Sequence, residues 1–145
     1  MSISTTRFGV VDYLERDVLE FSNGLIGMEE CRQWVLLADA KNKSLGWLQS
    51  VERGDLALPV VSPRRFVPNY QVRVSSRDVA TLGIETAKQA QILVVVSKTA
   101  EGMTLNLKAP IVVCLENRTG RQIIAKDDHA VQYLLGATVP FRRSA

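Results

Sequence analysis

The chain has 145 residues, of which 46% are hydrophobic and 23% charged, and a formal net charge of +3. This length suits one domain, and the composition excludes the polar, highly charged signature of intrinsic disorder. The longest conspicuous apolar run, Ile92 to Val96, is much shorter than the roughly 20 residues that cross a bilayer. We therefore expect a single folded domain over residues 1–145, with no membrane span and no membrane partner.

The first residues and the cysteines both point to the cytoplasm. Arg7, Asp12 and Glu15 break up the apolar residues at the N-terminus, so no continuous apolar core of a secretory signal is present. Cys31 and Cys114 belong to neither a Cys-x-x-Cys pair nor a Cys/His cluster, which argues against a zinc site and a redox motif. We expect two reduced thiols, with Cys114 buried inside an apolar run.

Short β-rich runs separated by Gly, Asn, Pro or Ser dominate the chain and predict a mainly antiparallel, all-β fold. The predicted strands are 8–11, 18–21, 34–37, 46–51, 56–61, 71–74, 92–96, 104–108, 111–115 and 122–125. The runs 92–96 and 111–115 are continuously apolar, so we expect them at the centre of the core. The segment 130–135 is predicted to be either a helical turn or a packed terminal segment.

Glycine, proline and serine residues predict the connections. The loop 22–27 contains two glycines that can adopt positive φ, and Gly120 is expected to do the same in a tight turn over 117–120. Prolines make 62–69 an edge or a loop, because proline cannot donate to a central ladder. Ser75 and Ser76 are helix-capping residues and predict one short helix over 77–82.

Several blocks, taken in order, resemble the flagellar assembly factor FliW family from about Phe8 to Gln122. The matching blocks are Phe21 to Gly27, Trp47 to Ser50, Leu56 to Val61 followed by Pro63, Phe66, Pro68 and Tyr70, Asn106 to Val112, and Gly120 to Gln122. The resemblance implies a small single-domain β-barrel-like fold with one or two short helices. It also implies a protein that binds flagellin and that binds and antagonises CsrA, a dimeric RNA-binding repressor of flagellin translation. We expect the free chain to be a monomer.

No recognisable catalytic set occurs in the sequence. His129 is the single histidine, and the two aspartates before it are neighbours in sequence, which does not make a triad or a metal site. The chain has no nucleophile elbow, no phosphate-binding loop and no spaced set of metal ligands. We therefore predict that the protein is not an enzyme and needs neither a metal nor another cofactor.

The residues expected to contact partners are aromatic, polar and proline side chains in or beside strands. They are Trp47, Gln49, Phe66, Pro68, Tyr70, Asn106, Lys108 and Pro110. Aromatic side chains supply much of the binding energy of protein interfaces, and an unpaired strand edge can accept an extended peptide. For Trp47 the alternative is burial in the core, for Gln49 and Asn106 the satisfaction of buried backbone groups, and for Pro110 the end of a strand.

A direct RNA-binding β-domain is the alternative from another class. The sequence pI of about 9.1 and the arginine pairs Arg64-Arg65 and Arg142-Arg143 favour it. Acidic residues nevertheless lie throughout the rest of the chain, which favours a solvated surface of mixed charge. We expect no direct binding of nucleic acid.

Overall fold

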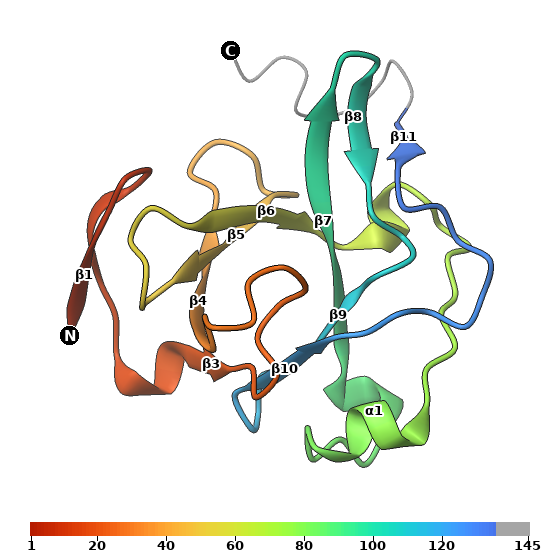
Figure 1. Ribbon diagram of the computed structural model, residues 1–145, viewed down its shortest axis with the longest axis horizontal. Coiled ribbons are helices and arrows are strands. Elements are labelled where there is room, and N and C mark those ends of the chain that lie inside the picture. Colours follow the sequence, from red (N-terminus) through yellow and green to blue (C-terminus); the bar gives the residue numbers. More distant parts are fainter. Residues whose placement is uncertain (136–145) are drawn as a thin grey trace.

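Eleven strands and one α-helix form in residues 1–135, the part of the chain that the computed structural model describes (Figure 1). The strands are β1 Ser2–Thr5, β2 Gly9–Asp12, β3 Val18–Glu20, β4 Gln33–Ala38, β5 Gly46–Ser50, β6 Ala57–Val61, β7 Gln91–Thr99, β8 Gly102–Leu105, β9 Ile111–Cys114, β10 Thr119–Gln122 and β11 Tyr133–Leu134. The helix is α1 Ser76–Ala80, and single 3-10 turns lie at Glu15–Asp17, Pro63–Arg65 and Ala87–Gln89.

Seven strands close into a barrel in the order β7-β6-β5-β4-β3-β10-β9, with β9 returning to β7. Neighbouring strands are antiparallel except β3 and β10, which run parallel and meet at Glu20 and Thr119. The upper part of β7 leaves the barrel and pairs with β8, which in turn pairs with β11 (Figure 1). The prediction of an all-β, barrel-like fold with few short helices is confirmed.

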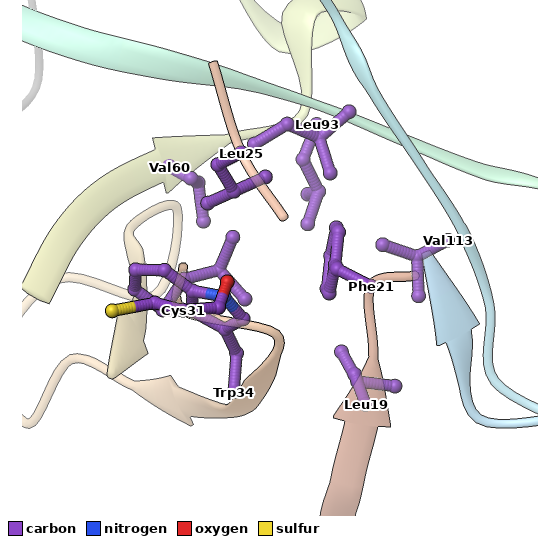
Figure 2. Close-up of a cluster of buried hydrophobic side chains, with 10 residues drawn as sticks. Leu19, Phe21, Leu25, Cys31, Trp34, Val60, Leu93 and Val113 are labelled. Atoms are coloured by element: carbon purple, nitrogen blue, oxygen red, sulfur yellow. The ribbon is translucent and has the colours of Figure 1, made fainter. Parts of the chain in front are cut away.

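The barrel interior is filled by large apolar side chains. Phe21 and Trp34 have no exposed surface, and Leu25 reaches into the same cluster from the glycine loop (Figure 2). The indole Nε1–H of Trp34 donates to the carbonyl of Cys31 at 3.0 Å, so the one polar group of this ring is satisfied. Full burial of side chains of this size contributes about 1.5–3 kcal/mol each.

The glycine loop adopts the predicted conformation, whereas the tight turn after β9 does not. Gly24 and Gly27 have φ values of 64° and 86°. In the later turn Arg118 takes the positive φ, at 56°, and Gly120 lies inside β10. A Cβ atom on Gly120 would lie 2.3 Å from Cζ of Phe21, so this position needs glycine for space and not for its dihedral angles.

Three further expectations about strands are wrong, and the first is the strand expected over 122–125, which forms instead as β10 three residues earlier. The segment 71–74 is not a strand, because its backbone bonds to the terminal segment 126–129 and not to a neighbouring strand. The strand expected over 104–108 ends at Leu105, since the chain turns there and the side chain of Asn106 accepts from the backbone N–H of Ala109 at 3.1 Å.

The remaining elements differ from expectation in their bounds. The helix begins at Ser76 and ends at Ala80, and the Ser75 hydroxyl caps it by accepting from the backbone N–H of Arg77. The strand β1 was not expected. It pairs with β2 as a separate hairpin at the left of Figure 1, which the Thr6 N–H bond to the Gly54 carbonyl at 3.0 Å ties to the barrel. Among the described residues no helix is long and apolar enough to cross a membrane.

Candidate partner-binding site

A groove of about 400 Å³ opens beside the glycine loop, directly over the barrel core. Met28, Leu58 and Val95 form its floor and pack against the buried barrel cluster below. The residues that line it are Ile26, Met28, Leu58, Val95, Ser97, Thr104, Asn106, Lys108, Ala109, Gln122, Ile124, Val131 and Gln132. We call this feature the mouth groove.

Three large apolar side chains at the mouth groove remain exposed to solvent. Ile26, Ile124 and Val131 are 51%, 57% and 61% exposed, although they come from three distant segments of the chain. Single exposed apolar residues are common on protein surfaces, but a group of them around one groove is typical of a binding surface.

Gln122 fixes the two sides of the mouth groove relative to each other. Its Oε1 accepts from the backbone N–H of Ile26 at 2.9 Å, and its Nε2 donates to the carbonyl of Ala109 at 3.0 Å. Because both ends of the amide are used, the glycine loop and the segment after β8 are held together by one side chain. The apolar residues of the groove are therefore presented on a positioned frame.

Asn106 and Lys108, both predicted to contact partners, lie together in the mouth groove. The Nζ of Lys108 donates to the carbonyl of Asp127 at 2.8 Å, which leaves its charge at the groove. Among the described residues that line the groove, Lys108 alone is charged. The groove therefore combines an apolar floor, amide groups and one cation.

Trp47 lies on a different part of the surface, against the N-terminal hairpin. Its indole Nε1–H donates to the carboxylate of Asp39 at 3.1 Å, and this bond, together with the backbone N–H groups of Asn42 and Lys41, lowers the pKa of Asp39. The guanidinium of Arg7 lies 4.3 Å from the centre of the indole ring, so the ring is half-buried under a cation.

Gln49 is fully buried in β5 and offers no side-chain surface to a partner. Its Nε2 lies 2.9, 3.1, 3.3 and 3.3 Å from the carbonyl oxygens of Ser50, Leu56, Arg53 and Gly54. The side chain thus holds the whole turn between β5 and β6. This is the alternative role considered for Gln49, the satisfaction of buried backbone groups.

Of the remaining predicted contacts, Pro68 is exposed, Phe66 is half-buried, and Tyr70 and Pro110 are buried. The Tyr70 hydroxyl donates to the carbonyl of Leu107 at 2.8 Å, and burial raises the pKa of Tyr70 to about 12. Tyr70 and Pro110 therefore support the surface from inside. The eight predicted residues do not form one continuous site.

The single histidine packs against the segment after the proline loop. The Nε2 atom of His129 lies 2.6 Å from the carbonyl oxygen of Gln71, and its ring centre lies 4.7 Å from that of Tyr70. Nearby, the backbone N–H and the guanidinium of Arg73 lower the pKa of Asp127. Within residues 1–135, no group of three or more His, Cys, Asp or Glu side chains is placed to hold a metal ion.

Ile26, Ile124, Val131 and Gln122 were not among the predicted contacts. Ile26 had a sequence signal, because an apolar residue between two loop glycines has no strand or helix to bury it. Ile124 and Val131 fall in stretches that could equally have been packed, and only the fold shows that they are exposed around one groove.

The fold and the groove define a small closed β-barrel with a filled interior and a partly apolar groove at one mouth. The chain matches the family model described as FliW protein over residues 2–135, and it belongs to the FliW family. It is 39% identical over 131 residues to the flagellar assembly factor FliW of Bdellovibrio bacteriovorus, which covers 89% of this chain and 75% of that protein. The FliW of Caldanaerobacter subterraneus is 36% identical, with 88% and 87% covered. A crystal structure of the flagellar assembly factor FliW superposes with a TM-score of 0.86 at 26% identity, covering 94% of this chain and 97% of that chain.

Proposed function

We propose that this chain is a non-enzymatic flagellar assembly factor that acts in the cytoplasm by binding flagellin and CsrA. The relatives named flagellar assembly factor support a role in flagellar assembly. The observation that carries the binding mode is the mouth groove, where Ile26, Ile124 and Val131 stand exposed around a positioned frame. Apolar side chains in a groove with a polar rim are the usual core of a protein interface.

The mechanism is sequestration by a monomer. The free protein binds CsrA and thereby relieves the repression of flagellin translation. While flagellin is abundant in the cytoplasm, flagellin occupies the protein and CsrA is free to repress. Export of flagellin releases the protein again, so that synthesis follows export. No covalent bond is made or broken in this cycle. The chain needs only surfaces whose affinities for the two partner proteins differ.

The double variant Ile26→Asp with Ile124→Asp tests the groove. Each aspartate replaces an apolar contact worth about 1.5–3 kcal/mol, so we expect affinity for at least one partner to fall by about 100-fold or more. The measurement is isothermal titration calorimetry with purified flagellin and CsrA. Leu115→Asp is the matched control, because Leu115 is also 54% exposed but does not line the groove.

The possible outcomes distinguish a wrong binding site from a wrong assignment of partners. If the folded double variant binds both proteins like the unchanged chain, the groove is not the binding site. If the unchanged chain binds neither, the assignment of partners is wrong. Binding to RNA whose affinity falls steeply with salt would instead support the nucleic-acid alternative.

A further inference from the structure

A second and larger cavity, of about 750 Å³, lies between the segment 70–74 and the lower part of β7. Its walls are mainly aliphatic and include Val74, Val79, Ile84 and Ile92, which pack around the buried residues of a separate cluster. The volume lies within the range of about 300–1,000 Å³ that is typical of ligand sites. The cavity shares no lining residue with the mouth groove.

The charged side chains that line this cavity are both arginines, and one of them pairs with a carboxylate outside the lining. Arg64 and Arg73 line it, and no carboxylate is among its described lining residues. The Nε–H of Arg64 donates to the carbonyl of Tyr70 at 3.0 Å, and that of Arg73 donates to the carboxylate of Asp127 at 3.1 Å. Each arginine is thus anchored through Nε, and its outer nitrogens can bind an anion in a forked geometry.

One wall of the cavity is a backbone segment that is bonded along one side. The carbonyl of Arg73 accepts from Lys126 at 3.3 Å, its N–H donates to the Asp127 carboxylate, and the carbonyl of Gln71 lies against His129. Bonds at alternate residues are the pattern of an extended chain, in which the next residues direct their backbone groups to the opposite edge. The backbone groups of Val72 and Val74 therefore face away from 126–129.

The opposite wall also presents a strand edge. On the β6 side, β7 is paired at Val94 and Val95 only. Its residues 91–93 pair with β9 along the other edge, and no strand among residues 1–135 accompanies them on the β6 side. The two walls of the cavity thus have backbone groups that an added strand could pair with.

We propose that this cavity binds an extended peptide segment in which apolar side chains alternate with carboxylates or end in one. The peptide adds as a short strand, its apolar side chains enter the aliphatic floor, and its carboxylates meet Arg64 and Arg73. The strand edges favour a peptide over a small amphipathic acid, which would use the floor and the arginines alone. This site is separate from the mouth groove and does not depend on which partner that groove binds.

The test is a titration followed by amide NMR with two synthetic peptides. The first is a seven-residue peptide of alternating valine and glutamate with a free C-terminal carboxylate. The second has lysine in place of glutamate and an amidated C-terminus. We expect the amide signals of Val72, Val74 and Ile92 to shift and saturate at about 5 mM of the acidic peptide, and to respond at least tenfold more weakly to the basic one.

Matched variants test the two kinds of contact. Arg64→Gln with Arg73→Gln should weaken the acidic peptide at least about tenfold. Arg65→Gln with Arg77→Gln removes the same charge outside the cavity and should leave the affinity within about twofold. Ala87→Trp fills the cavity from an exposed lining position and should block binding, whereas Ala80→Trp, exposed on α1 outside it, should not.

Three results would overturn the proposal. The first is the absence of shifts at these amides with the acidic peptide. The second is saturation of the same amides by decanoate but not by the peptide, which would identify a small amphipathic acid as the occupant. The third is shifts without any peptide that depend on protein concentration, which would identify a second copy of the chain.

Discussion

Gln49 shows how one buried amide can organise a turn. Four backbone carbonyls converge on its Nε2, while its Oε1 is buried and has no partner among the described residues. The reverse orientation of the amide would set its oxygen against those carbonyls, so the donor set fixes the orientation. From the sequence alone, this glutamine could have faced solvent. Its full burial in the structure shows that its side chain serves the turn instead.

Replacing Gln49 by alanine should therefore destabilise the fold strongly. The buried carbonyls lose their donor, and we expect the free energy of unfolding to fall by roughly 2–4 kcal/mol. Urea unfolding followed by tryptophan fluorescence measures this loss. Gln33→Ala, at an exposed position of β4, should cost less than about 0.5 kcal/mol. Equal losses at the two positions would contradict the role given to Gln49.

Gly120 sets how closely β10 approaches the ring of Phe21. Gly120→Ala would place a methyl group against a ring that has no exposed surface, so we expect a loss of about 2 kcal/mol or more. Phe21→Leu should cost less in the Gly120→Ala background than in the unchanged chain, because the smaller side chain relieves the clash. Additive losses in this double-mutant cycle would show that the two residues do not compete for the same space.

At the scale of elements, the terminal segment is held by contacts between side chains and backbone. Asp127 accepts from the backbone N–H and the guanidinium of Arg73, and these bonds lower its pKa below the ordinary value of 3.8. A carboxylate with a lowered folded-state pKa stabilises the fold above its ordinary pKa, and this stabilisation is lost as the pH falls through the folded value.

We therefore expect the segment 126–135 to loosen in acid before the barrel unfolds. Amide hydrogen exchange at His129 and Leu107, whose N–H groups bond to Asp127 and Ala130, should lose protection as the pH falls below about 3.8 after correction for intrinsic exchange. Asp127→Asn keeps the shape of the side chain but should remove this pH dependence. An unchanged pH dependence in that variant would assign the transition to another group.

Most strands could be predicted because they bury alternating or continuous apolar side chains. The errors fall where backbone bonding follows no apolar pattern. The segment 71–74 has the composition of a strand but bonds to Asp127 and His129, which lie more than fifty residues later. Conversely, β1 carries Ile3 alone among polar residues, so its sequence gives little sign of pairing.

At the scale of the whole molecule, the barrel shape could be expected from the pattern and the family resemblance, but the mouth groove could not. Asn106 and Lys108 were expected at partners and lie in the mouth groove. Trp47 and Gln49 were also expected to contact partners but do not line the groove; they lie two residues apart on β5 and therefore share one face of that strand. The groove forms from distant segments of the chain, such as those that contain Ile26 and Val131. Barrel closure brings these segments together, and the local sequence does not predict their proximity.

The whole fold depends on apolar burial far more than on ion pairs. Within residues 1–135 there are three ion pairs, Arg53–Asp55, Arg73–Asp127 and Arg121–Asp78, and all are at least partly exposed. Exposed pairs contribute about 0–1 kcal/mol each, and salt screens them. Raising sodium chloride from about 0.1 to about 1 M should change the free energy of unfolding by less than about 1 kcal/mol. A loss above about 2 kcal/mol in urea titrations at the two salt concentrations would indicate a larger electrostatic contribution.

The two buried cysteines can report how often the barrel opens. Cys31 and Cys114 are 1% and 0% exposed, so a thiol reagent in solution reaches them only when the surrounding structure opens. The rate at which each thiol is modified would then report how often its part of the barrel opens, without any added label. For the same reason, a cysteine introduced at the mouth groove could be coupled to a fluorophore while the two native cysteines remain unmodified.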